Sequence, residues 1–165
     1  MKKLLLVIGI IIFSFSLGFA ACNQVKDSKT INQVQENDYP KLWADLPYGA
    51  LLDSWGSGTK SCASWVSWRA WQDLRYKVDR WGEAKFWPEK AQSVGLTVDL
   101  KPAVGSAMVN THYYPGHIMW VESINADGTV HISEYNKDGD GKYNERDAST
   151  ELMVFIHFPK IDRGY

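Results

Sequence analysis

The stretch KSCASWVSWRAWQDL, residues 60–74, decides how the rest of the chain is interpreted. Its apolar side chains recur at the three- and four-residue intervals of a helix, and a glycine-rich segment, residues 55–58, precedes it. Either Thr59 or Ser61 is placed to cap the free amide groups of the first turn. The sequence therefore predicts a helix that begins beside Cys62.

A cysteine in the first turn of a helix has altered chemistry. The unpaired amides and the dipole of the helix favour negative charge, so a thiol there loses its proton more readily than a free cysteine does. The resulting thiolate is the nucleophilic form. The alternative for Cys62 is a small apolar residue packed under the helix start, because free cysteines are among the most buried residue types.

The first 21 residues have the pattern of a secretory signal peptide. Two lysines follow Met1, an apolar run extends to Phe13, and small residues precede Cys22. The alternative is a retained membrane anchor, although the apolar run is short for a span of about 20 residues. The pattern predicts an exported protein.

The residues before Cys22 resemble the lipobox of bacterial lipoproteins, in which a cysteine is lipidated and becomes the mature N-terminus. They are Phe19-Ala20-Ala21-Cys22, with Phe where that family prefers Leu. The resemblance implies a lipoprotein anchored to the membrane at the cell surface through Cys22. Gly18-Phe19-Ala20 also fits an ordinary signal-peptidase site and simple secretion. Because the chain has two cysteines, a Cys22–Cys62 disulfide is a further alternative.

Composition divides the chain into three parts. Residues 1–21 are the predicted signal peptide, and residues 22–38 form a polar tether, without aromatic residues, that lacks the apolar surface to order itself. Residues 39–165 have the length of one domain, which we expect to be monomeric. The chain has 18 basic and 19 acidic side chains and no basic tract, which argues against nucleic acid as a partner.

The folded part changes from helical to strand patterns near residue 97. Helices are predicted within 42–46, 62–74 and 83–94, and strands within 102–109, 116–124, 129–136 and 152–158. The segment Asn125-Ala126-Asp127-Gly128 between two of these strands is a strong hairpin signal. Helices followed by an antiparallel sheet predict an α+β domain, with the N-terminal helices packed on the C-terminal sheet.

This hairpin brings polar side chains to one face. Alternation puts His117 on the face of Glu134 and Asn136 if the connecting loop has two or four residues, whereas a three-residue loop would separate them. Buried polar groups need partners, so these side chains form a predicted network. A histidine that is held by a carboxylate or an amide and faces a thiolate is the arrangement of a cysteine hydrolase.

Three segments in this order resemble the signature segments of CHAP domains, the cysteine- and histidine-dependent amidohydrolase/peptidase family of bacterial cell-wall enzymes. They are SCASWVSWR (61–69), GHIMWVESI (116–124) and VHISEYN (130–136), and the resemblance extends from about residue 51 to the last strand. It implies a papain-like (NlpC/P60-type) fold. It also implies a cysteine-dependent peptidoglycan hydrolase, either an N-acetylmuramoyl-L-alanine amidase or an endopeptidase, with a thioester intermediate.

The same resemblance implies roles for four residues. Cys62 matches the family nucleophile and His117 the general base, while Glu134 matches the third residue and Asn136 the amide that accompanies it. The residue before the cysteine is often Gln in the family and is Ser61 here. This departure puts a side-chain donor to the oxyanion in doubt and leaves the backbone amide of Cys62 available.

Two further patterns concern ligands. Trp55 and Trp120, two of eight tryptophans, flank the proposed site in sequence and are predicted to line the substrate cleft. Residues 136–147 approximate a calcium-binding loop whose oxygen donors include Asp138 and Asp140, but the loop lacks the final bidentate Glu. A polar hairpin tip is the alternative to calcium, and we expect no other cofactor.

The main alternative to an enzyme is a noncatalytic module that binds the cell wall and carries a degenerate active site. Cys62 would then be unreactive or bound in a disulfide. Peptidoglycan is the partner that the resemblance implies in either case, and an exported chain is in the right place to reach that polymer.

Overall fold

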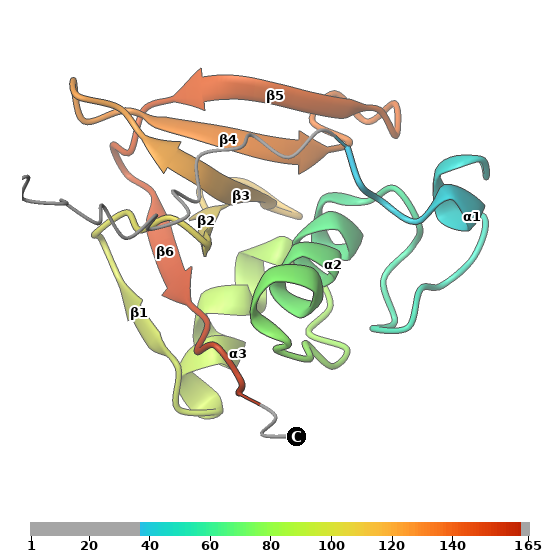
Figure 1. Cartoon of the computed structure of the whole chain (residues 1–165), viewed down its shortest axis with the longest axis horizontal. Coiled ribbons are helices and arrows are strands. Elements are labelled where there is room, and N and C mark those ends of the chain that lie inside the picture. Colours follow the sequence, from blue (N-terminus) through green and yellow to red (C-terminus); the bar gives the residue numbers. More distant parts are fainter. Residues whose placement is uncertain (1–36, 163–165) are drawn as a thin grey trace, which may run out of the picture. The chain divides into compact units, whose positions relative to one another are not determined.

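The computed structural model describes residues 37–162, in which helices precede strands along the chain (Figure 1). The predicted signal peptide, Cys22 and most of the tether lie outside this range. Among the described residues, no helix combines the length and the apolar character that crossing a membrane requires. The helical segments are α1 (Lys41–Ala44), α2 (Cys62–Leu74), the 3-10 helix η1 (Ala84–Phe86) and α3 (Trp87–Ser93).

The strands form one antiparallel sheet in the order β1-β6-β2-β3-β4-β5. The predicted α+β class, with helices before an antiparallel sheet, is confirmed. The strand bounds are β1 (Thr97–Asp99), β2 (Ser106–Asn110), β3 (His117–Ile124), β4 (Val130–Tyr135), β5 (Tyr143–Ala148) and β6 (Val154–His157).

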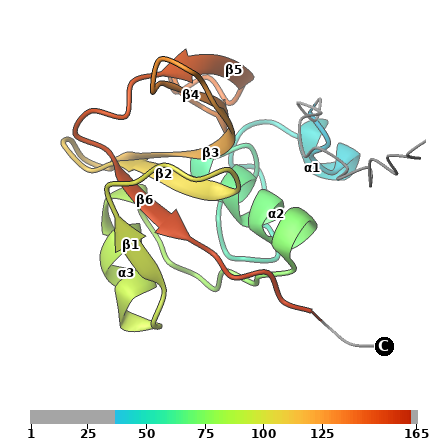
Figure 2. The ribbon, with the colours of Figure 1, turned by 60° about the vertical axis from the view of Figure 1, so that its left-hand side comes forward.

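The helices cover one face of this sheet. Helix α2 packs against β3 and β4, and α3 packs against β1 and β6 (Figures 1 and 2). The core between these layers contains Trp65 and Val66 of α2 and Trp120 of β3, all almost fully buried. Packing of these large apolar side chains fixes the end of α2 that carries Cys62 against the sheet.

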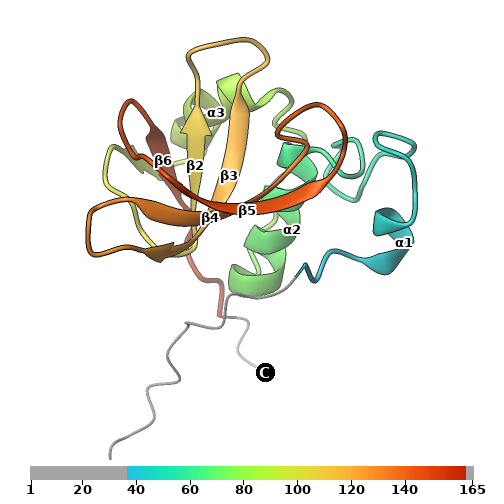
Figure 3. The ribbon, with the colours of Figure 1, turned by 90° about the horizontal axis from the view of Figure 1, so that it is seen from above.

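The opposite face of the sheet has its own apolar cluster because the sheet curls. Figure 3 shows β4 and β5 running across the direction of β2 and β3. Alternate residues of β3 therefore belong to different clusters: Trp120 faces the helices, while Met119 and Val121 pack with Phe155 of β6 on the other side.

The β3–β4 hairpin differs from both expected loop lengths. An amide of Asn125 donates to the carbonyl of Thr129 at 2.9 Å, which closes a three-residue loop of Ala126, Asp127 and Gly128. Such a loop alone would place His117 and Glu134 on opposite faces. A β-bulge between Val121 and Ser123 inserts one residue into β3 and restores their common face.

Strand β5 was not predicted, because residues 136–147 were interpreted only as a calcium loop or a hairpin tip. The turn between Tyr135 and Tyr143 is indeed a hairpin tip, but β5 continues to Ala148 along the free edge of β4. The described end of the predicted tether is also ordered: Asn37 donates to the Tyr135 hydroxyl, and Asp38 accepts from the Trp68 indole.

Candidate active site

Cys62 is the first residue of α2, as the sequence predicted. Ser61 is the N-cap, and its hydroxyl accepts a hydrogen bond from the Ser64 amide at 3.1 Å. Thr59, the other candidate for the cap, is fully buried and does not cap the helix. The amides of Cys62 and Ala63 have no intrahelical acceptor, because the first amides of a helix never do. They are available to an anion at this end.

The backbone immediately before Cys62 is held by Tyr39. The amide of Lys60 donates to the Tyr39 hydroxyl at 3.0 Å, and that hydroxyl also bonds the Ser64 hydroxyl at 2.5 Å. Lys60 has a φ of 63°, a conformation that needs support from its surroundings. Burial raises the pKa of Tyr39 to about 12, so this phenol stays neutral and keeps the turn in place.

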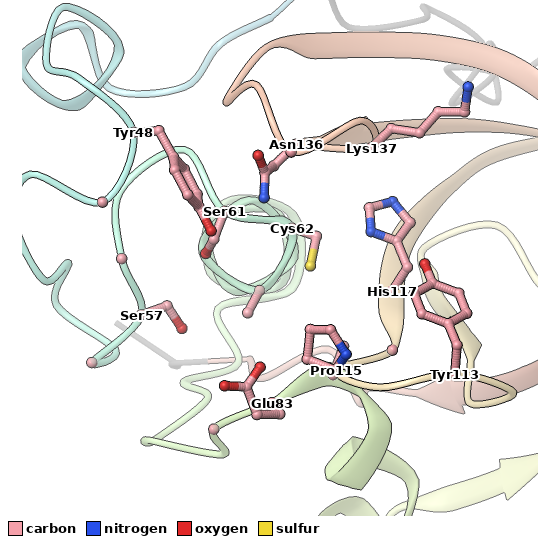
Figure 4. A pocket seen from close by; sticks show the side chains of 18 residues that line it. Tyr48, Ser57, Ser61, Cys62, Glu83, Tyr113, Pro115, His117, Asn136 and Lys137 are labelled. Atoms are coloured by element: carbon pink, nitrogen blue, oxygen red, sulfur yellow. The ribbon is translucent and has the colours of Figure 1, made fainter.

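His117 is the first residue of β3 and faces the start of α2 (Figure 4). Its Nε2 lies 2.7 Å from Oε2 of Glu134, which leaves Nδ1 for the sulfur of Cys62. Cys62 is a free thiol in this structure, and the alternative Cys22–Cys62 disulfide involves a residue outside the described range. The structure thus brings Cys62, His117 and Glu134 together in the order sulfur, imidazole, carboxylate.

Sequence reasoning missed two residues of β5 that hold Glu134. The Asn144 amide donates to Oε1 of Glu134 at 2.9 Å, and Nε of Arg146 donates to the same oxygen at 2.8 Å. Glu134 is fully buried, and these contacts satisfy the carboxylate oxygen that does not bind His117. The available signal was the alternation of Asn144 and Arg146 opposite the polar face of β4.

The hydrogen bonds of this group stabilise charged forms. Burial lowers the pKa of His117, but hydrogen bonds and negative charge from Cys62 and Glu134 outweigh burial and raise it from 6.5 to about 9. Burial raises the pKa of Glu134, yet hydrogen bonds from His117 and from β5 lower it to about 2. The arrangement therefore favours a His117 imidazolium paired with the Glu134 carboxylate and close to the sulfur of Cys62.

We expect the His117 imidazolium to persist to alkaline pH. The pKa of His117 in the folded protein is about 9, above the ordinary histidine value of 6.5, so protonation of His117 stabilises the folded state. This stabilisation is complete below pH 6.5 and is lost as the pH rises through 9. NMR titration of the imidazole should show a midpoint near pH 9, and a lower midpoint in Glu134→Gln, which lacks the negative charge. The control Glu145→Gln removes a carboxylate that pairs with His131 instead. A wild-type midpoint near 6.5 would contradict the ion pair.

Cys62 and His117 open into a cleft of about 550 Å³. Asn136 also lines it, but its Oδ1 accepts from the Gly141 amide at 2.8 Å and thereby holds the β4–β5 turn. Figure 4 shows its amide nitrogen directed toward the Cys62 side of the cleft. In this structure the carboxylate of Glu134, rather than this amide, contacts the imidazole. Other lining residues are Tyr48, Ser57, Glu83, Tyr113 and Lys137.

The structure corrects the expectation that Trp55 and Trp120 line this cleft. Trp120 is 1% exposed and faces the helices in the core, where its ring stacks on Phe158. Trp55 is 5% exposed and lies beside a separate hollow, with Trp43 and Trp68. Proximity to the site in sequence was misleading because the direction of each side chain was unknown.

The predicted calcium ligands are engaged with lysines. Asp140 pairs with Lys142 at 2.8 Å, and Asp138 lies 3.7 Å from Lys137. Within residues 37–162, no group of three or more His, Cys, Asp or Glu side chains is close enough to hold a metal ion. Calcium binding at this turn stays a prediction.

A second buried network joins the helix of Cys62 to the strand of His117. The guanidinium of Arg69 in α2 binds both carboxylate oxygens of Glu122, the residue at the β3 bulge. Ser133 of β4 donates to the same carboxylate at 2.5 Å, and the Trp65 indole donates to Ser133 at 2.9 Å. Arg69 and Glu122 are 4% and 8% exposed. This network fixes α2 on the sheet next to the site.

Comparison with known proteins agrees with this geometry. Residues 52–136 match the family model of the CHAP domain. The staphylococcal secretory antigen SsaA of Staphylococcus aureus is 45% identical over 56 residues, which are 34% of this chain and 22% of that protein. The antigen ssaA2 from the same species is 37% identical over 81 residues, 47% of this chain and 30% of that protein. The chain thus matches less than a third of the length of these relatives.

A solved structure gives the same result for the fold. The crystal structure of an N-acetylmuramoyl-L-alanine amidase from Staphylococcus aureus superposes with a TM-score of 0.55 and 27% sequence identity, over 72% of this chain and 36% of that one. The predicted papain-like α+β fold is thereby confirmed. With a family model that covers the residues from before α2 to the end of β4, the chain belongs to the CHAP domain family.

Proposed function

We propose that this protein is an exported cysteine hydrolase that cleaves an amide bond of peptidoglycan. One observation carries the proposal: a free cysteine at a helix start, an imidazole and a buried carboxylate meet at one cleft. The similarity to an N-acetylmuramoyl-L-alanine amidase and to secretory antigens supports this substrate and this location. Lipidation of Cys22 remains a prediction.

The first half of the reaction forms a thioester. The Cys62 thiolate attacks the carbonyl carbon, and the oxygen of that carbonyl takes the negative charge beside the amides of Cys62 and Ala63. Nδ1 of the His117 imidazolium then gives its proton to the amide nitrogen. The carbon–nitrogen bond breaks, the amine leaves and the acyl group stays on sulfur.

The second half regenerates the enzyme. Neutral His117 takes a proton from water through Nδ1, and the resulting hydroxide attacks the thioester carbon. The carbon–sulfur bond breaks, a carboxylic acid leaves, and the Cys62 thiolate and His117 imidazolium return. Glu134 stays ionised throughout and holds Nε2, which fixes the orientation of the ring and stabilises the imidazolium.

Digestion of purified peptidoglycan tests the proposal and identifies the bond. The purified protein should release soluble fragments, and mass spectrometry should find one type of new end. Free lactyl carboxyl groups on muramic acid, together with new N-terminal alanine, would establish an amidase. The similarity of this chain to an N-acetylmuramoyl-L-alanine amidase favours that outcome. New ends within the peptides would establish an endopeptidase. Binding to the wall without new ends would contradict the enzyme and support a noncatalytic module.

A further inference from the structure

Two charged side chains besides the Cys62–His117 pair line the cleft, and they lie on opposite sides of Cys62 (Figure 4). Lys137 follows β4 and lies 3.7 Å from Asp138 in the exposed turn. Glu83 precedes η1 on the other side. Within the part of the chain that the structure describes, the Glu83 carboxylate has neither a hydrogen bond nor an ion pair with a protein group.

The cations nearest to Glu83 in sequence do not neutralise it. Neither Arg80 nor Lys85 forms an ion pair with it among residues 37–162, and the Arg80 side chain instead packs beside the backbone of Gly56. Glu83 precedes a helical turn but makes no side-chain capping bond there. The contacts of the Glu83 carboxylate therefore identify no role for it in the fold.

The backbone around Glu83 is nevertheless firmly held. The carbonyl of Gly82 accepts from the indole of Trp87, which is fully buried, and Ala84 is 4% exposed in the core. One residue further, the Lys85 amide donates to the Pro115 carbonyl at 2.9 Å, which ties this loop to the segment that leads into His117. The carboxylate thus extends from a fixed base, as groups that bind substrate usually do.

An exposed carboxylate on a firmly held backbone, without a protein cation and in the same cleft as Cys62, is suited to a cationic ligand group. Peptidoglycan supplies such a group, because its peptides carry free primary amines wherever they are not cross-linked. We propose that Glu83 binds a primary ammonium group in the peptide part of the substrate and so selects the peptide that enters the cleft. This inference rests on the proposed function, since it assigns the specificity of the same site.

Acetylation of the substrate amines tests this pairing. Purified peptidoglycan is treated with acetic anhydride or mock-treated, and kcat/KM for fragment release is measured on both. The wild type should be about tenfold slower on acetylated wall, because one charged hydrogen bond is lost. Glu83→Gln should be about tenfold slower on mock-treated wall and insensitive to acetylation, because the interaction is already absent.

The matched control is Glu89→Gln in α3, which is exposed and does not line the cleft; it should retain the wild-type response. Unchanged circular dichroism and thermal melting of Glu83→Gln would show that folding is intact. Equal wild-type rates on both walls, or an acetylation response that survives in Glu83→Gln, would overturn the assignment. Absence of fragments from either wall would instead reject the hydrolase itself.

Discussion

Cys62→Ala and His117→Ala should each lower kcat/KM for fragment release by about 10⁴-fold, and the double variant should be no slower than either one. The expected equality follows from the contact between the two groups, which the structure places on one cleft with Glu134 behind the imidazole. Without sulfur there is no thioester. Without the imidazole, the leaving amine receives no proton and the thiolate loses its counter-ion.

Rates on purified peptidoglycan and binding to the same insoluble wall are measured for all three variants. Binding should change little, because each substitution removes one side chain of the cleft and leaves the rest of its lining in place. The control is His112→Ala, which removes an exposed histidine bonded to the Leu152 carbonyl. Retention of more than about a tenth of the activity by either single variant would contradict the assigned roles, since general acid–base catalysis alone contributes about 10²-fold or more.

Glu122→Ala should lower the free energy of unfolding by about 3 to 5 kcal/mol. The substitution leaves the buried Arg69 guanidinium with Asp73 as its remaining carboxylate partner, and it leaves the Ser133 hydroxyl without its acceptor. Urea denaturation of wild type and variant measures the difference. Fragment release should fall as well, since the pair joins the helix of Cys62 to the strand of His117.

A combined variant separates charge from packing in the same network. Arg69→Met together with Asp73→Asn and Glu122→Leu removes all three charges that meet there and should recover most of the lost stability. The exposed pair of Lys41 and Asp45 is the control: Asp45→Ala should cost less than about 1 kcal/mol. A Glu122→Ala cost as small as that of the exposed pair would show that the buried pair contributes little.

Local patterns were sufficient to predict the helix of Cys62 and the hairpin strands. The apolar spacing of residues 62–74 and the alternation in β3 and β4 are short-range signals, and both elements occur within a residue or two of the expected bounds. The alternation also predicted that His117 and Glu134 share a face, although it assumed a loop of two or four residues instead of three residues and a bulge. These features depend on neighbours along the chain.

Features that depend on distant contacts were not predictable. Strand β5 is a run of polar and charged residues, so it lacks the apolar alternation by which strands are recognised, and it forms because it pairs with β4. The burial of Trp120 follows from the side of β3 that α2 covers. The pairing of Arg69 with Glu122 joins residues 53 positions apart at a bulge that no local signal marks.

The three-residue loop and the bulge in β3 compensate for each other, so that the side chains of β3 before the bulge lie on the face where the site needs them. Each one alone would rotate the first half of β3 by one side-chain step and send His117 to the wrong side of the sheet. Insertions or deletions in this hairpin are therefore tolerated only in compensating pairs. The extra residue is Glu122, whose carboxylate also binds Arg69. One position therefore determines both how α2 is held on the sheet and which face the first half of β3 presents.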